Sequence, residues 1–256
     1  MRKTLFSGIA ACLLATAATA AEQSPSVIWT VGQADRSASE FALAPDRFRD
    51  FLANDFGYED KYFLVGHSVP AADFPYVLPG PADTWGGTWP TSGWRTHQVN
   101  ILFGLKEIPS DGTCTLVVDL LDYAKNFLPL VKVSVNTQDA KFQLDAPGLC
   151  VADQRKPNQM EKIVDTLSIT GNLAKATPRR LEIPIRPGVL KAGGNEVTIT
   201  VLEGSWILFD RVSLEGPAGT NVEQPQQLFI RNIEAAPYEL ADGKRRVQPL
   251  LVDLEW

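Results

Sequence analysis

The chain has 256 residues, of which 45% are hydrophobic and 21% are charged, so it is long enough to bury a core in one large domain. Its formal net charge is −6, which argues against nucleic acid and anionic membrane surfaces as partners. It contains no phosphate loop, no dinucleotide-binding glycine motif and no zinc-ligand spacing, which excludes the commonest nucleotide and zinc sites.

The N-terminus has the features of a secretory signal peptide. Arg2 and Lys3 precede an apolar run over residues 5–14, and the small-residue site Ala18-Thr19-Ala20 follows. This pattern predicts residues 1–21 as a cleaved signal peptide and a secreted or periplasmic mature protein. The apolar run is too short for a permanent membrane span, and no other span is predicted.

Three cysteines add two open questions. Cys12 closes the sequence Ile9-Ala10-Ala11-Cys12, which resembles a bacterial lipoprotein processing site and is the alternative to conventional cleavage. Cys114 and Cys150 remain in the mature chain, and an oxidising compartment permits a disulfide between them. Spacing alone does not show that these two residues meet.

Short alternating segments predict β-strands through the first half of the mature chain. An amphipathic helical segment begins at Pro45, because Phe48, Phe51, Leu52 and Phe56 recur at helical spacing; we expect it to cap the edge of a sandwich. The expected strands in this half cover residues 26–32, 62–66, 98–105, 114–121 and 130–136.

Residues 79–95 form a loop between two of these strands and carry three of the six tryptophans of the chain. Glycine and proline in the loop exclude a regular helix or a central strand. Flat indole faces can stack on sugar rings, with nearby polar side chains donating and accepting hydrogen bonds. The alternative is that the rings cover one end of the core. We expect carbohydrate binding by Trp85, Trp89 and Trp94, with Arg95, His97 and Asp83 as polar partners.

The second half is less regular at first. Residues 137–178 show one expected strand near 166–170, and clearer strands follow within residues 179–185, 197–201 and 206–214. A polar boundary at 216–227 precedes two further strands, at 228–234 and 246–254. The predicted fold is all-β: an antiparallel sandwich or jelly roll over residues 22–217, with one short amphipathic helix and a C-terminal strand extension over 218–256.

No constellation of residues predicts catalysis. Gly66-His67-Ser68 lacks the pattern of a nucleophile elbow, and no spacing supports a serine–histidine–aspartate triad. Asp35 and Asp210 can join backbone oxygens around calcium, although hydrogen bonding to backbone or arginine is the commoner role. We therefore assign no catalytic residue, no metal ligand and no cofactor, and leave calcium open.

Several motifs follow one another along the chain: IWTVGQAD (28–35), EF (40–41), YFLVGHS (62–68), NILF (100–103), VKVSVN (131–136) and several short segments within 190–215. Their order resembles the C-terminal carbohydrate-binding-like domain of rhamnogalacturonan lyases (polysaccharide lyase family 4, domain III). The resemblance implies a jelly-roll module that accompanies a lyase acting on pectin-type polymers outside the cell. In that family the β-elimination residues lie in a separate, larger domain, so none is transferred here. Residues 137–178 and the tryptophan loop depart from the family pattern.

Three functions follow from these observations. The first is an exported carbohydrate-binding module of a polysaccharide lyase or glycoside hydrolase system, non-catalytic by itself, with a polysaccharide or oligosaccharide as ligand and a catalytic lyase or hydrolase domain as partner. The second is a small polysaccharide lyase cleaving rhamnogalacturonan by β-elimination, with His67 or His97 as base and Arg95 neutralising a uronate. The third is a structural module whose indoles are buried against a partner domain.

Overall fold

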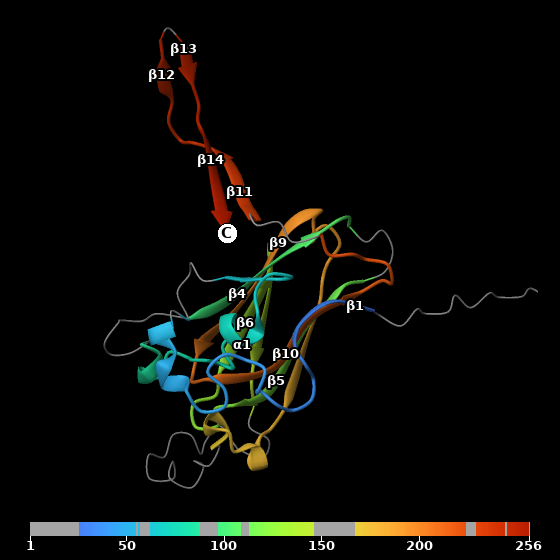
Figure 1. The fold of residues 1–256 in the computed structure, drawn as a ribbon, viewed down its shortest axis with the longest axis vertical. Coiled ribbons are helices and arrows are strands. Elements are labelled where there is room, and N and C mark those ends of the chain that lie inside the picture. The colour runs from blue at the N-terminus through green and yellow to red at the C-terminus, as the bar shows by residue number, and fades with distance from the viewer. Residues whose placement is uncertain are drawn as a thin grey trace, which may run out of the picture.

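The fold is known from a computed structural model, which describes residues 26–54, 56, 62–87, 97–108, 113–145, 167–223, 229–243 and 245–255. Two five-stranded sheets form the body of the protein (Figure 1). The first runs β1-β10-β5-β8, with β3 paired to β10, and the second runs β2-β4-β9-β6-β7. Among the described strands every pairing is antiparallel except β2 with β4.

The strand bounds agree closely with the alternating segments of the sequence. In the first sheet the strands are β1 (Ser26–Gly32), β3 (Val77–Leu78), β5 (Thr115–Tyr123), β8 (Arg179–Pro184) and β10 (Ile207–Gly216). In the second they are β2 (Tyr62–Leu64), β4 (Gln98–Leu105), β6 (Leu130–Val135), β7 (Gln138–Gln143) and β9 (Gly193–Glu203). The structure therefore confirms the predicted all-β sandwich.

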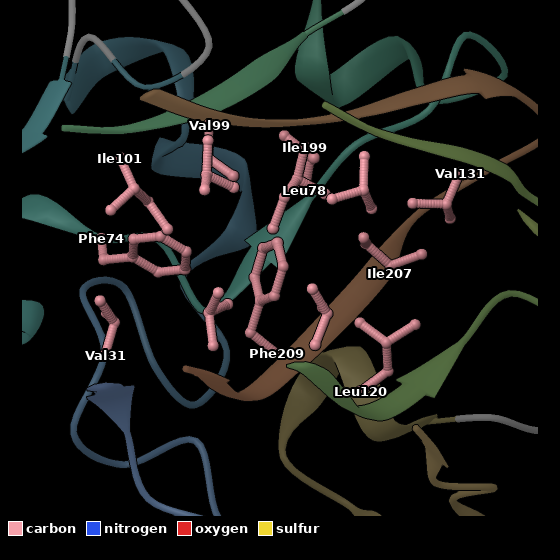
Figure 2. Close-up of a cluster of buried hydrophobic side chains, with 14 of the residues drawn as sticks. Val31, Phe74, Leu78, Val99, Ile101, Leu120, Val131, Ile199, Ile207 and Phe209 are labelled. Atoms are coloured by element: carbon pink, nitrogen blue, oxygen red, sulfur yellow. The ribbon is translucent and has the colours of Figure 1, made fainter. Parts of the chain in front are cut away.

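Apolar side chains from the inner faces of both sheets fill the space between them. In β6 the period of two is plain: Val131, Val133 and Val135 are fully buried, whereas Lys132 and Ser134 are only partly buried. Figure 2 shows part of this core, with side chains of the two sheets turned toward one another: Val99, Ile101, Val131 and Ile199 from the second, and Val31, Leu120, Ile207 and Phe209 from the first.

Helical structure in the described residues is short and differs in detail from expectation. The segment after Pro45 forms two 3-10 turns, η1 (Phe48–Asp50) and η2 (Leu52–Asn54), rather than a continuous α-helix. So short a segment has few internal hydrogen bonds, and the packing of its rings decides its shape. A four-residue helix, α1 (Pro70–Asp73), was not predicted.

Two expectations for residues 137–178 were wrong. The strand expected near 166–170 is the 3-10 turn η6 (Leu167–Thr170), followed by η7 (Leu173–Lys175). The Ser168 hydroxyl in this turn donates to the buried Asp122 carboxylate at 2.6 Å, a tertiary contact that the local pattern does not encode. Conversely, β7 was missed because it is an edge strand with the polar sequence QDAKFQ.

A long hairpin extends beyond the sandwich at the C-terminus, drawn in red in Figure 1. Its base pairs β11 (Phe229–Ala235) with β14 (Leu250–Glu255), and its tip pairs β12 (Leu240–Asp242) with β13 (Arg245–Val247). The expected C-terminal hairpin is therefore present. Across the described ranges, no helix has the length and apolar character needed to cross a membrane.

Replacing Phe209 by alanine tests the core assignment. Its ring is fully buried and lies 5.0 Å from that of Phe74. We expect Phe209→Ala to lower the free energy of unfolding by about 3–5 kcal/mol, because burial is lost and a cavity remains. Urea unfolding measures the change. Val69→Ala, at a side chain that is 57% exposed, is the control and should change stability by less than about 0.5 kcal/mol. Equal losses in both variants would contradict the assignment.

Candidate functional site

Asp83 fixes the start of the tryptophan loop. One carboxylate oxygen accepts the Gly80 backbone N–H at 2.8 Å, and the other accepts the Ser205 hydroxyl. The Trp85 side chain also donates to this carboxylate. Asp83 is only 7% exposed, so its position favours a role in holding the loop against the turn before β10 rather than in touching a ligand.

Gly80 and Gly204 allow the backbone of the tryptophan loop to lie close to the backbone of the turn before β10. A Cβ at Gly80 would lie 2.5 Å from the Gly204 carbonyl oxygen. Gly204 itself has a φ of +81° and packs against the Leu128 carbonyl group. Side chains at either position would separate the tryptophan loop from the turn that carries Ser205.

Trp85 lies in the 3-10 turn η3 (Thr84–Gly86) and is half-buried. Its ring meets Phe48 edge-on, with centroids 5.0 Å apart, and Phe51 in the same manner at 6.1 Å. With the indole N–H bonded to Asp83, three contacts hold the ring in one orientation. The ring thus both covers the end of the core and leaves part of its surface accessible.

His97 stands at the other end of the loop, immediately before β4. Its ring lies 5.6 Å from that of Phe51 and is 3% exposed. Phe51 therefore joins Trp85 and His97 into one group, which we call the aromatic corner (Phe48, Phe51, Trp85 and His97). The structure brings Asp83, Trp85 and His97 together at the two ends of the loop. Trp89, Trp94 and Arg95 lie outside the described residues.

Two residues beside the aromatic corner were missed in the sequence. The exposed Arg49 guanidinium lies 5.1 Å from the centroid of the Phe48 ring. Phe127 is 47% exposed, and its carbonyl oxygen accepts the N–H of Ser205, the residue whose hydroxyl bonds Asp83. Neither Arg49 nor Phe127 has a local sequence signal. Arg49 follows Phe48, which the helical spacing marks as a core position, and Phe127 is a single aromatic residue in a turn.

The two histidines do not share a site. His67 follows β2, and His97 precedes β4. These strands are parallel and pair Tyr62 with Asn100 and Leu64 with Leu102, so the histidines lie beyond opposite ends of the pair. His67 is exposed, whereas His97 is buried.

A cavity of about 250 Å³ is lined by the loop after β1 and by the segment that carries η6 and η7. Its floor includes Leu121 of β5 and Leu208 of β10, and hydroxyl groups of Ser37, Ser39 and Ser168 line it. Tyr76 also lines it and donates to the Ile169 carbonyl at 2.7 Å, while the Phe48 backbone bonds the same hydroxyl. The Tyr76 side chain thus connects this cavity to the aromatic corner.

Asp35 and Asp210 both accept backbone hydrogen bonds. Asp210 accepts the Arg36 N–H at 3.0 Å, and Asp35 accepts the Ser37 N–H at 2.9 Å. Burial raises the pKa of Asp210 to about 6. Within the described part of the chain, no group of three or more histidine, cysteine or acidic residues is placed to hold a metal ion. Cys114 is buried, and Cys150, whose pairing with Cys114 the sequence left open, lies outside the described residues.

Two packed, mainly antiparallel sheets define the class of all-β sandwich modules. The chain belongs to the CBM-like domain III family of polysaccharide lyase family 4, whose model matches residues 27–214. The match spans β1 to β10 and contains the aromatic corner, and it confirms the resemblance found in the sequence.

One similar solved structure is that of a family GH115 4-O-methyl-α-glucuronidase with specificity for decorated arabinogalactans. The identity is 16% and the TM-score 0.28, over 48% of this chain and 14% of that chain. The present chain thus matches a small part of that enzyme. No curated protein matches the chain.

The buried carboxyl of Asp83 predicts a specific pH dependence of stability. Burial raises its pKa from 3.8 to about 6, against hydrogen bonds from Ser205, Gly80 and Trp85 that act in the opposite direction. Between pH 3.8 and about 6 the Asp83 carboxyl group is protonated in the folded chain and ionised in the unfolded chain. The stabilisation is full below 3.8 and is lost as the pH rises to about 6.

Urea unfolding of the wild type and Asp83→Asn at a series of pH values measures this effect. The stability of the wild type relative to the variant should fall by on the order of 2 kcal/mol across the interval. Asp139→Asn is the control, because Ser134 and Lys132 lower the pKa of this exposed carboxyl and the dependence has the opposite sign. A pH-independent difference for Asp83→Asn would refute the burial argument.

Proposed function

We propose that the protein is an exported carbohydrate-binding module, non-catalytic by itself, that works with a catalytic lyase or hydrolase domain on a polysaccharide. Membership of the CBM-like family over residues 27–214 supports carbohydrate as the ligand class. The observation that carries the proposal is Trp85, a partly exposed indole held in one orientation by Phe48, Phe51 and Asp83. A ring fixed before binding loses little conformational entropy when a sugar stacks on it.

The binding surface in this proposal is the tryptophan loop together with the rim beside it. Trp85, Trp89 and Trp94 provide stacking faces, and Phe127, whose backbone carbonyl accepts the Ser205 N–H, adds an exposed ring. Arg95, predicted from the sequence as a polar partner of the tryptophans, is the polar side chain that contacts the ligand in this proposal. Asp83 and His97 are positioning residues, because their side chains are buried at the two ends of the loop.

An acidic sugar is the ligand we favour, and local charge is the reason. The chain carries a net charge of −6, so a uronate needs basic groups close to the stacking surface. Arg49 is exposed at the aromatic corner, and no carboxylate of the described residues forms an ion pair with it. With Arg95 it supplies two cations for a pectin-type polymer such as rhamnogalacturonan.

Export is part of the proposal and rests on the sequence of residues 1–21. The basic residues, the short apolar run and the small-residue site have the order of a cleaved secretory signal. A secreted or periplasmic location would bring the module to the polysaccharides that its family is associated with.

Binding assays with single variants test the site. We expect Trp85→Ala to weaken affinity for rhamnogalacturonan oligosaccharides about tenfold or more, and Phe127→Ala to weaken it less. Trp85→Phe separates stacking from folding, because it keeps a ring in the aromatic corner. Tyr238→Ala, at an aromatic residue of the C-terminal hairpin that is 51% exposed, is the matched control. Isothermal titration measures each affinity, and unchanged binding in Trp85→Ala and Phe127→Ala would reject the site.

The alternative function, a small lyase, predicts a different result. β-Elimination at a uronate creates an unsaturated product that absorbs in the ultraviolet, so activity can be followed directly. The separation of His67 from His97 and the burial of His97 favour binding without cleavage. We expect no absorbance increase when the mature chain is incubated with rhamnogalacturonan or pectin. An increase that is lost in His67→Ala would establish the lyase instead.

A further inference from the structure

The cavity of about 250 Å³ lies over the outer face of the first sheet. In Figure 2, Ile207 and Phe209 of β10 turn into the core, so Leu208 between them points to the opposite side, where it lines the cavity. Residues 37–45 of the loop after β1 contribute a first wall, and residues 168–173 contribute a second wall. None of the described residues that line the cavity belongs to the tryptophan loop.

Tyr76 links the two walls of the cavity. Its backbone N–H donates to the Ala42 carbonyl of the first wall at 3.1 Å, and its hydroxyl donates to the Ile169 carbonyl of the second wall at 2.7 Å. The second wall is also bonded to the sheet, because the Ser168 hydroxyl donates to Asp122 of β5 at 2.6 Å. Walls that are fixed in this way need little further ordering when a ligand binds.

The backbone of the first wall is strained at two positions. Arg36 has a φ of +64° and Leu43 a φ of +67°, and they lie at the two ends of residues 37–42. Residues with side chains adopt this left-handed conformation only where the surrounding structure holds them. Here the Arg36 N–H donates to Asp210 at 3.0 Å, and Leu43 is buried. Strain maintained by such contacts is typical of binding sites.

The serine hydroxyls of the cavity have complementary hydrogen-bonding capacity. Ser168 gives its hydrogen to the Asp122 carboxylate, so any bond between its hydroxyl oxygen and a ligand is one that it accepts. The Ser37 hydroxyl donates to the Ser39 oxygen at 2.9 Å and accepts the Ser39 N–H at 3.2 Å, so the Ser39 hydroxyl keeps its hydrogen for a ligand. A ligand that bonds both Ser39 and Ser168 must accept and donate, as hydroxyl groups do.

The lining of the cavity suits an uncharged ligand about the size of one sugar ring. Among its described lining residues none carries a charge, so a carboxylate would lose its water there without gaining an ion pair. Leu121, Leu173 and Leu208 offer apolar surface to C–H groups. The volume is below the about 300–1,000 Å³ of pockets for drug-sized ligands, which points to a smaller molecule.

We propose that this cavity is a second sugar-binding site, which takes one neutral monosaccharide unit at the end or on a side branch of a polysaccharide. The hydroxyls of the sugar bond Ser39 and Ser168, and its C–H groups lie on the leucines of the floor. The fit to a neutral sugar rests on the lining of the cavity; only the polysaccharide as its source rests on the proposed function. The tryptophan loop favours an acidic unit, so the two sites would contact different units of one polymer.

Saturation-transfer NMR of the mature chain, residues 22–256, with neutral monosaccharides tests the proposal. The probes are D-glucose, D-galactose, D-xylose, L-arabinose and L-rhamnose, and D-galacturonate is the charged competitor. We expect at least one neutral sugar to bind with a Kd on the order of 1 mM, and galacturonate not to displace it. Absence of binding by all the neutral sugars overturns the proposal, as does displacement by an equal concentration of galacturonate.

Variants of the first wall locate the bound sugar. Ala38→Phe places a ring in the cavity and should weaken binding about tenfold or more, and Ser39→Ala removes the donor and should weaken it about threefold to tenfold. Ala34→Phe, at an exposed position of the same loop outside the lining, is the matched control and should bind as the wild type does. Circular dichroism checks that each variant is folded.

Two results with these variants contradict the proposal. Binding that persists unchanged in both Ala38→Phe and Ser39→Ala overturns it. A loss confined to Trp85→Ala would place the neutral sugar at the tryptophan loop and equally overturn it. Because the proposed function is tested with rhamnogalacturonan oligosaccharides and this site with neutral monosaccharides, each can fail while the other stands.

Discussion

The tryptophan loop depends on one buried carboxylate. Asp83 accepts hydrogen bonds from Gly80, Ser205 and Trp85, so a single side chain links the strand β3, the turn before β10 and the indole. The carboxyl group is desolvated, because Asp83 is only 7% exposed, and this burial raises its pKa. The donors around the carboxyl group offset part of the cost of burial. Besides this link, ring contacts of Trp85 and the backbone hydrogen bond from the Ala82 N–H to the Gly204 carbonyl, at 2.9 Å, hold the start of the loop at the end of the sandwich.

Buried aspartates that accept hydrogen bonds also hold other loops of the first sheet. Asp122, fully buried in β5, accepts bonds from Lys125, Ser168 and the Thr177 backbone, and so fastens the turns η6 and η7 over the outer face of the sheet. Asp210 in β10 fastens the loop after β1 through the Arg36 N–H. Residues of these loops line the cavity of about 250 Å³. Buried acids in strands therefore shape one side of the molecule, while apolar packing shapes its interior.

The strands could be predicted because their signal is local. Val131, Val133 and Val135 alternate with polar residues, and this period of two alone places them in the core. The edge strand β7 gave no such signal, because its polar sequence suits solvent exposure. The turn at Leu167–Thr170 resembled a strand, and only the distant Asp122 explains its actual shape.

The candidate site could be located but not assigned in detail from the sequence. Clustering of tryptophan, glycine and proline identified the loop, whereas the burial of Asp83 and His97 depends on contacts with residues far along the chain. Phe48 was interpreted as a core residue, and its edge-on contact with Trp85 shows that it also supports the loop. Contacts of this kind, between side chains that lie far apart along the chain, follow no sequence period and no sequence motif.

The loop is anchored at both ends: Asp83 secures its entrance, and His97 is packed on Phe51 at its exit. The intervening residues, 84–96, are thus bounded by two attachment points that belong to the sandwich rather than to any ligand. Such an arrangement makes the loop an exchangeable cassette. Its sequence can diversify, by natural drift or by grafting in the laboratory, on an unchanged scaffold.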